Sequence, residues 1–347
     1  MLLLTKAPTT MKAVALTRYL PITDPESLFN VDLPKPQAAG RDLLVRVEAV
    51  SVNPVDTKVR APKPDVEKTP RVLGWDAAGV VESVGPNVTS FRPGDDVFYA
   101  GDITRPGTNS EYHLVDGRIV GHKPSSLSFA EAAALPLTSI TAWETLFERL
   151  GVDRDADNSD RTLLILGGAG GVGSIAIQLA KWSGLIVIAT ASRPETQDWV
   201  KGLGADHVVD HRQPLPPQLA AIGHKEVNFI ANFNNTDAYW VVMAESIKPQ
   251  GRIVSIVEND HPVEIGLLKS KSASFGWVFM FTRAMFQTAD MAEQGKILDR
   301  IAQLVDAGII RTTLTERLSP ISASNMRAAH AKSESGRTIG KVAISGW

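Results

Sequence analysis

The sequence predicts an α/β protein of two domains, in which a doubly wound parallel sheet interrupts a small β domain. Three observations predict it. Residues 11–120 contain short β-type runs separated by proline and glycine, which is typical of a small barrel-like β domain. Residues 162–257 alternate β-type and helix-type runs, which favours a parallel sheet. A last β-type run at 340–344 indicates that the chain returns to the first domain.

The β domain is expected to come first in the chain. A helical stretch follows it at 129–150, where Ser128 and Glu131 form the Ser-x-x-Glu pattern of a capping box. Residues 153–160 are polar and lead into the parallel sheet. The predicted strands of the β domain are 13–17, 42–51, 79–84, 96–99 and 111–115.

The second domain is expected to alternate strands and helices. Residues 269–288 after it are aromatic and irregular, and 290–306 are helical in character. The predicted strands are 162–166, 185–190, 207–209, 227–231 and 251–257, and the predicted helices between them are 171–183, 194–203 and 238–247.

Composition excludes several classes of function. The chain has 347 residues and a net charge of −2, from 36 basic and 38 acidic side chains, which predicts no nucleic-acid partner. No apolar run approaches 18 residues, so no membrane partner is expected. The absence of cysteine excludes disulfides, thiolate metal sites and cysteine nucleophiles, and it fits a cytoplasmic protein. Residues 1–10 are expected to form a loose tail.

A glycine-rich turn at 166–174, with the sequence LGGAGGVGS, lies between a predicted strand and a predicted helix. Gly168 and Gly170 can adopt backbone angles that other residues avoid. Gly171 and Gly173 let the chain approach a pyrophosphate and let the helix pack on the sheet. The helix start offers N–H groups to the phosphates. The strand–turn–helix context therefore predicts a dinucleotide site, with contacts from Gly168, Ala169, Gly170, Gly171, Val172 and Gly173.

The end of the second predicted strand indicates which dinucleotide binds. An NAD site carries an acidic residue there, whereas this chain has Ser192 and Arg193. An arginine can hold the extra 2′-phosphate of NADP. We interpret Glu195 as part of a capping box with Ser192, because Pro194 suits the first position of a helix. NADPH is therefore the predicted cofactor, and the alternative is that Arg193 is only a solvated residue at a helix start.

Five segments together resemble the medium-chain dehydrogenase/reductase superfamily, and most closely its zinc-free quinone oxidoreductase branch. The segments are 51–56 (SVNPVD), 73–85 (LGWDAAGVVESVG), 91–97 (FRPGDDV), 134–143 (ALPLTSITAW) and the glycine-rich turn. The resemblance implies a Rossmann nucleotide-binding domain at 144–283, inserted into a GroES-like β-barrel catalytic domain at 1–143 plus 284–347. It also implies a homodimer joined through the nucleotide domains.

The chain departs from the zinc enzymes that it resembles. Asn53 stands where those enzymes have a cysteine ligand, and Trp75 stands where they have a histidine. The region near Leu137, where the third ligand is expected, offers no thiol or imidazole. Because zinc needs three or four ligands from histidine, cysteine or carboxylate, no metal is expected.

A reductase without a metal is expected to favour acceptors whose conjugated bonds spread the negative charge that the hydride brings. The predicted function is therefore NADPH-dependent reduction of a quinone or a similar conjugated carbonyl. The alternatives are an enoyl or 2-alkenal reductase and a catalytically idle NADPH-binding sensor or crystallin-like protein. The sequence has no Gly-x-Ser-x-Gly elbow and no P-loop lysine, which disfavours other enzyme classes.

Four residues are candidates for catalysis. The amide of Asn53 can donate a hydrogen bond to the substrate oxygen or to the cofactor, although it is equally a turn residue before Pro54. Asp56 and Lys58 can serve in a proton relay, and Tyr99 is a possible donor. Lys58 also fits an ordinary surface charge. No dedicated general acid is identified, so water can supply the proton.

Further residues are candidates for the pocket and the cofactor. Trp75 and Tyr99 are expected to line the substrate pocket, unless they are ordinary core residues. The resemblance places Thr138 and Thr141 near the nicotinamide, with helix capping as the alternative. It also places Trp277 and Phe281 at the substrate pocket, and Phe279, Phe281 and Lys341 at the cofactor. Hydrophobic packing explains these aromatic residues nearly as well.

Overall fold

The computed structural model describes residues 9–347 and divides them into two compact units. The first unit holds residues 9–137, 281–307 and 314–347, and the second holds 138–280 and 308–313. Most of the predicted tail lies outside the described residues, and the first strand, β1 (Thr10–Tyr19), begins at its edge. Within the described residues, no helix is both long and apolar enough to cross a membrane.

The second unit holds 138–280 where 144–283 was predicted, and it also includes the short segment 308–313. The backbone of this segment is held there by Gln178, whose side chain accepts from the amide of Arg311 at 2.9 Å and donates to the carbonyl of Arg311 at 3.3 Å. The Arg311 guanidinium also donates to the carbonyl of Gly202 at 2.8 Å.

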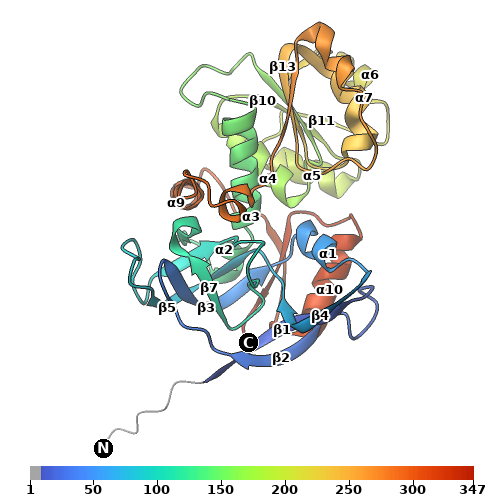
Figure 1. Cartoon of the computed structure of the whole chain (residues 1–347). Helices are drawn as coiled ribbons and strands as arrows, with labels where there is room; N and C mark the ends of the chain where they lie inside the picture. Colours follow the sequence, from blue (N-terminus) through green and yellow to red (C-terminus); the bar gives the residue numbers. More distant parts are fainter. Residues whose placement is uncertain (1–8) are drawn as a thin grey trace, which may run out of the picture. The chain divides into compact units, whose positions relative to one another are not determined.

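The first unit is built on two sheets. One has the order β2-β1-β4 and is antiparallel. The other has the order β15-β16-β3-β5-β6-β8, and β7 also pairs with β3. The remaining strands are β2 (Phe29–Pro34), β3 (Asp42–Ser51), β4 (Lys63–Val72), β5 (Ala77–Val84), β6 (Asp96–Tyr99), β7 (Tyr112–Asp116), β8 (Gly121–His122), β15 (Leu314–Leu318) and β16 (Lys341–Ser345). Its helices are α1 (Pro54–Arg60), η1 (Gly117–Ile119), α2 (Phe129–Ala133), α8 (Thr282–Met285), α9 (Glu293–Asp306) and α10 (Ala323–Glu334) (Figure 1).

The last strand positions the site in the first unit. β16 pairs antiparallel with β3, with Ala343 opposite Ser51. This pairing confirms that the chain returns to the first domain, and it brings the start of β16 beside the residues that follow β3.

The second unit is a parallel sheet of six strands in the order β11-β10-β9-β12-β13-β14. In this doubly wound order the chain reverses direction across the sheet between β9 and β12. The strands are β9 (Thr162–Leu166), β10 (Ile186–Thr190), β11 (His207–Val209), β12 (Val227–Asn232), β13 (Ile247–Ser255) and β14 (Ser274–Trp277). The helices are α3 (Pro136–Trp143), which begins at the boundary of the units, the π-helix η2 (Glu144–Arg149), α4 (Gly171–Trp182), α5 (Pro194–Gly202), α6 (Leu215–Ala221), α7 (Thr236–Ser246) and η3 (Ile265–Lys271).

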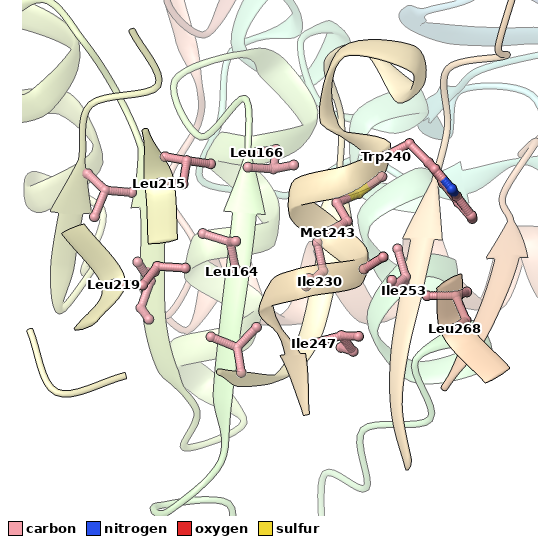
Figure 2. Close-up of a cluster of buried hydrophobic side chains, with 14 residues drawn as sticks. Leu164, Leu166, Leu215, Leu219, Ile230, Trp240, Met243, Ile247, Ile253 and Leu268 are labelled. Atoms are coloured by element: carbon pink, nitrogen blue, oxygen red, sulfur yellow. The ribbon is translucent and has the colours of Figure 1, made fainter. Parts of the chain in front are cut away.

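Alternate residues of the parallel strands form the core beneath α6 and α7. Leu164, Ile230 and Ile253 come from three neighbouring strands and point to one face of the sheet (Figure 2). Met243 and Trp240 of α7 cover them from that side. This period of two is what a parallel sheet with helices on a face requires, and it confirms the predicted fold class.

The sequence missed several elements of the fold. β4 was not predicted because its sequence, KPDVEKTPRV, is polar, holds two prolines and is mostly exposed. β14 lies in the segment predicted to be irregular. The helical stretch predicted at 129–150 is three segments, and Pro136, which cannot donate a backbone hydrogen bond, begins the second of them.

Candidate functional site

The glycine-rich turn follows β9 in the second unit. Gly167 has a φ of 87°, so the left-handed backbone lies there and not at Gly168 or Gly170 as the sequence analysis expected. The Thr190 hydroxyl at the end of β10 accepts from the Gly167 amide at 3.0 Å. This hydrogen bond ties the turn to the neighbouring strand.

Close packing explains two of the glycines. A Cβ on Gly173 would lie 2.3 Å from the Gly167 carbonyl oxygen, and a Cβ on Gly168 would lie 2.9 Å from the Cβ of Ala189. The first contact brings the start of α4 directly onto the turn. α4 begins after Gly170, which has no side chain to cap the first-turn amides. These amides and the positive end of the helix dipole form an anion site.

A polar network holds the loop beyond β12, the strand at which the sheet order reverses. The Asn232 amide donates to the hydroxyls of Thr236 at 3.3 Å and Ser255 at 3.2 Å. The loop lies against the glycine-rich turn, because a Cβ on Gly167 would sit 3.5 Å from the Phe233 carbonyl oxygen. The turn and this loop therefore meet at the switch point where dinucleotides bind in doubly wound sheets.

Two arginine side chains lie near the end of β10. Arg193 is the N-cap of α5, and its guanidinium lies 3.3 Å from the Glu195 carboxylate. The capping box predicted for Ser192 and Glu195 is therefore wrong, because the amide of Arg193 donates to the Thr196 hydroxyl instead. Arg212 reaches the same place from beyond β11 and donates to the Ser192 carbonyl oxygen. Sequence reasoning missed Arg212 because only the pairing of β10 with β11 brings it there.

A buried polar cluster lies in the first unit, where β16 meets the end of β3. The Lys341 ammonium donates to the Val52 carbonyl at 3.0 Å, to the Asp76 carboxylate at 2.9 Å and to the side-chain oxygen of Asn53. The Asn53 amide nitrogen in turn donates to Asp76 at 2.8 Å. Lys341, Asn53 and Asp76 are each no more than 4% exposed. All three N–H groups of the ammonium are used within the cluster.

Two carboxylates complete this cluster. Burial raises the pKa of Asp76, and Lys341 and the Leu137 amide, which donates at 2.8 Å, oppose that rise. Burial also raises the pKa of Asp56 to about 7, although a hydrogen bond from the backbone N–H of Asn53 opposes it. That hydrogen bond is 2.6 Å long and caps the start of α1, while the other oxygen of Asp56 is buried without a partner among the described residues. Asp76 was not predicted from the sequence, although it lies in the segment 73–85 that carries part of the family resemblance.

Three of the residues predicted for catalysis or cofactor binding, Asn53, Lys341 and Lys58, differ in whether they belong to this cluster. The Asn53 amide is engaged by Asp76 and Lys341, so in this arrangement it holds the cluster together. Lys341 has no remaining N–H for a cofactor. Lys58 is exposed on α1 and is not a member of the cluster. The roles predicted for these residues in catalysis stay predictions.

Tyr99 is buried in the first unit and bonded to His113. Its ring stacks on the His113 ring at 5.5 Å, and the two side chains are joined at 3.1 Å. The Nε2 of His113 lies 2.9 Å from the Pro106 carbonyl, which only accepts, so Nδ1 accepts from the Tyr99 hydroxyl. Burial raises the pKa of Tyr99 and lowers the pKa of His113 to about 4. These contacts hold Tyr99 in the interior of the first unit, and the donor role predicted for it stays a prediction.

The predicted aromatic residues lie in different environments. Trp75 and Phe281 are both buried in the first unit, with their rings edge to face at 6.1 Å. Trp277 ends β14 and is 45% exposed, and Phe279 is 47% exposed. Trp277 is at the carboxyl end of β14, and the glycine-rich turn follows the carboxyl end of β9. Because the strands are parallel, both lie along the side of the sheet formed by the carboxyl ends of its strands. Thr138 and Thr141 of α3 are buried.

Family models match two parts of the chain. Residues 39–143 match the alcohol dehydrogenase GroES-like domain, and residues 203–344 match a family described as zinc-binding dehydrogenase.

Known proteins are similar over nearly the whole chain. A zinc-type alcohol dehydrogenase-like protein of Staphylococcus epidermidis is 42% identical over 91% of this chain and 94% of its own. The mitochondrial NAD(P)H oxidoreductase RTN4IP1 of Mus musculus is 32% identical over 88% of this chain and 81% of its own.

Solved structures share the fold. A putative zinc-dependent alcohol dehydrogenase from Rhizobium etli has a TM-score of 0.93 and 55% identity, and the match covers 97% of this chain and 98% of that one. A quinone oxidoreductase from Coxiella burnetii has a TM-score of 0.79 and 28% identity, covering 97% of this chain and all (100%) of that one.

Several of these names mention zinc, but the residues of the buried cluster do not suit zinc. Asn53 and Asp76 already bind the Lys341 ammonium, so a metal ion there would meet a positive charge. The segment from 51 to 76 contributes no cysteine or histidine. Across residues 9–347, no three histidine or acidic side chains gather as metal ligands do. The donor set therefore does not fit zinc.

Proposed function

Because the chain belongs to the medium-chain dehydrogenase/reductase superfamily and is an NAD(P)H oxidoreductase of it, we propose that it reduces a quinone or a similar conjugated carbonyl with NADPH and without zinc. A hydride, carrying two electrons, leaves the nicotinamide for the acceptor. One proton from water completes the hydroquinone or the saturated carbonyl, and NADP⁺ is the other product. The cofactor supplies the chemistry, and the protein supplies binding and orientation.

The observation that carries the proposal is the buried cluster around Lys341. A zinc reductase stabilises negative charge on the substrate oxygen with the metal. Here the positive charge at Asn53 and Asp76 is an ammonium whose donors are all used. An acceptor that delocalises the incoming charge needs less help from a Lewis acid, which favours quinones and enones over simple ketones and alcohols.

The two arginines at the end of β10 support NADPH over NADH. Arg193 and Arg212 both lie beside Ser192, and the strand itself ends without an acidic residue. The nearby acids, Glu195 and Asp210, are already paired with these arginines. A 2′-phosphate would therefore meet two guanidinium groups, for which phosphate is a strong partner.

The test follows the absorbance of the reduced nicotinamide in chelator-treated protein. NADPH and NADH are compared against a benzoquinone, an α,β-unsaturated ketone and a saturated ketone. The expected result is consumption of NADPH with a conjugated acceptor, slower consumption of NADH and none with the saturated ketone. The quinone and enone arms separate quinone reduction from activated-alkene reduction.

Two results would overturn the proposal. One is activity that is lost on chelation and restored by one equivalent of zinc. The other is tight NADPH binding with no turnover on any acceptor, which would favour the catalytically idle alternative.

We also propose that the protein is a homodimer joined through the second unit. β14 is an edge strand of the parallel sheet, and Trp277 and Phe279 at its end are about half exposed. An exposed strand edge with apolar side chains is a surface that proteins usually cover. Sedimentation at micromolar concentration is expected to show a dimer, and replacing Trp277 with lysine is expected to weaken it. A monomer at that concentration would contradict the proposal.

A further inference from the structure

A cavity of about 240 Å³ lies in the first unit, on residues that the cluster around Lys341 does not use. Four segments that are far apart in sequence form its walls. Arg41 precedes β3, the loop 87–91 follows β5, Arg118 and His122 come from η1 and β8, and Lys296 and Asp299 come from the start of α9. Its size suits a small molecule rather than a whole dinucleotide.

The cavity is preformed because its walls meet through the backbone. A Cβ on Gly295 of α9 would lie 2.7 Å from the Arg118 carbonyl oxygen and 2.8 Å from that of Val120. Asp299 accepts from the backbone amide of His122 at 2.8 Å. α9 is therefore held directly against the segment 118–122, so the two walls that these segments form are in place before a ligand binds.

The charge of the lining is positive. Arg41, Arg118 and Lys296 line the cavity with Asp299 as the only lining acid, and Asp299 is bonded to His122. Arg118 is held by Asp116 at 3.0 and 2.8 Å, and Lys296 by Glu293 at 2.6 Å.

Arg41 differs from the other two cations. No side chain of residues 9–347 pairs with its guanidinium. The acid next to it in sequence, Asp42, is taken by Arg105 through two hydrogen bonds of 2.8 and 3.0 Å. The guanidinium of Arg41 therefore keeps all of its donors for a ligand, and a guanidinium binds carboxylates and phosphates through two parallel hydrogen bonds.

One wall of the cavity is aromatic. The Phe91 ring stacks on the His122 ring with their centres 4.7 Å apart and their planes at 26°. Thr89 and Ser90, on the same loop as Phe91, add hydroxyl groups to the lining. A ligand that suits both walls has an oxyanion at one end and a flat apolar group at the other.

We propose that this cavity binds a small organic anion, in which a carboxylate or phosphate group next to a flat apolar group is held by Arg41. The site is separate from the proposed reductase chemistry and does not rest on it. Arg41 and Lys296 are both exposed, but Lys296 contributes a weaker attraction because it is already paired with Glu293.

The test is calorimetric titration of the full-length protein with four probes. Phenyl phosphate and benzoate carry both the anion and the ring, inorganic phosphate carries only the anion, and phenol carries only the ring. Saturable binding is expected for at least one of the first two, and at least tenfold tighter than for its single-feature relatives. Comparing phenyl phosphate with benzoate then tells phosphate ligands from carboxylate ligands. Repeating the titration with NADPH present separates this cavity from any phosphate binding at the glycine-rich turn.

Three variants locate the binding. Arg41→Gln is expected to weaken it about tenfold or more, as the loss of a charge-assisted contact does. Lys296→Gln is expected to weaken it about two- to threefold. Arg92→Gln is the matched control, because it removes an equally positive side chain that is 86% exposed, next to Phe91 but outside the cavity. The proposal is overturned if no probe binds at millimolar concentration, if phenol binds as well as the anions, or if Arg41→Gln and Arg92→Gln have equal effects.

Discussion

The glycine-rich turn of the second unit and the buried cluster of the first unit are both built around charge, but they are assembled in opposite ways. The turn is one continuous segment, and its anion site consists of backbone amides that no side chain caps. In the cluster, Asn53 follows β3, Asp76 precedes β5 and Lys341 begins β16. Every N–H group of the Lys341 ammonium donates to a member of the cluster or to the Val52 carbonyl. The turn is thus open to a ligand, whereas the cluster is closed.

The difference predicts two kinds of sensitivity. A change in the turn should act through space, because the backbone itself occupies the room that a side chain would need. A change in the cluster should act through charge, because each member neutralises or solvates another. Substitutions in the turn and in the cluster therefore separate these two effects.

The largest effect is expected for Gly173→Val, because it should abolish cofactor binding as well as lower stability. Even the first added carbon would lie 2.3 Å from the Gly167 carbonyl oxygen, so α4 must move away from the turn. NADPH binding should be lost, and the free energy of unfolding should fall by roughly 3 kcal/mol or more, as for severe overpacking. Calorimetric titration and urea denaturation measure the two changes.

Gly170→Ala is the control within the same turn. Its φ is −73°, and a Cβ there would lie 3.5 Å from its nearest neighbour, an ordinary contact. Its stability should therefore stay within about 0.5 kcal/mol of the parent. If Gly170→Ala unfolds the protein as readily as Gly173→Val, the steric explanation is wrong.

Lys341→Met tests the closed cluster and should cost about 3–5 kcal/mol of stability, because it leaves a buried carboxylate without its partner. The cost should shrink at acidic pH, where Asp76 takes up a proton, since burial already raises the pKa of that group. Lys332→Met is the matched control, because the side chains of its ion pair with Glu316 are 45% and 37% exposed, and exposed pairs contribute about 0–1 kcal/mol. Equal losses in the two variants would show that the cluster is not held by its charges.

The same contrast explains what the sequence could predict. The turn was predictable because strand, glycines and helix are consecutive, and the strand 162–166 was predicted with the bounds that the structure gives. The error within it, which placed the left-handed backbone at Gly168 and Gly170 when it lies at Gly167, concerns a backbone angle that neighbouring residues decide. The cluster was only partly predictable, because Asn53 and Lys341 are 288 residues apart and only the pairing of β16 with β3 brings them together. Arg212 was not predicted for the same reason, since its position beside Ser192 depends on the pairing of β11 with β10.

Asp56→Asn should make stability less dependent on pH. In the folded state the pKa of Asp56 is raised to about 7 by burial, against roughly 3.9 in an unfolded chain. Its contribution to stability is therefore fully present below about pH 4 and is lost as pH rises through 7. That loss is on the order of 4 kcal/mol by the usual conversion. The side-chain oxygen of the new asparagine can still accept from the backbone N–H of Asn53, so the α1 cap should survive.

Denaturation curves at pH 5 and pH 8 check this prediction. The variant should be the more stable protein at pH 8, and its advantage should decline toward pH 5. Equal pH dependence in the parent and in Asp56→Asn would mean that Asp56 titrates in its ordinary range.

The smallest effect is expected for Arg193→Gln, at the end of β10. It should weaken NADPH binding about tenfold and leave NADH binding nearly unchanged. A lost charge-assisted contact of about 1.4 kcal/mol gives that factor. The folded state should hardly change, because the ion pair of Arg193 with Glu195 is partly exposed. Arg212→Gln should weaken NADPH by a similar factor if both guanidinium groups reach the 2′-phosphate. Equal losses for NADPH and NADH in either variant would mean that the arginine contacts a part that both cofactors share, and the preference for NADPH would then need another source.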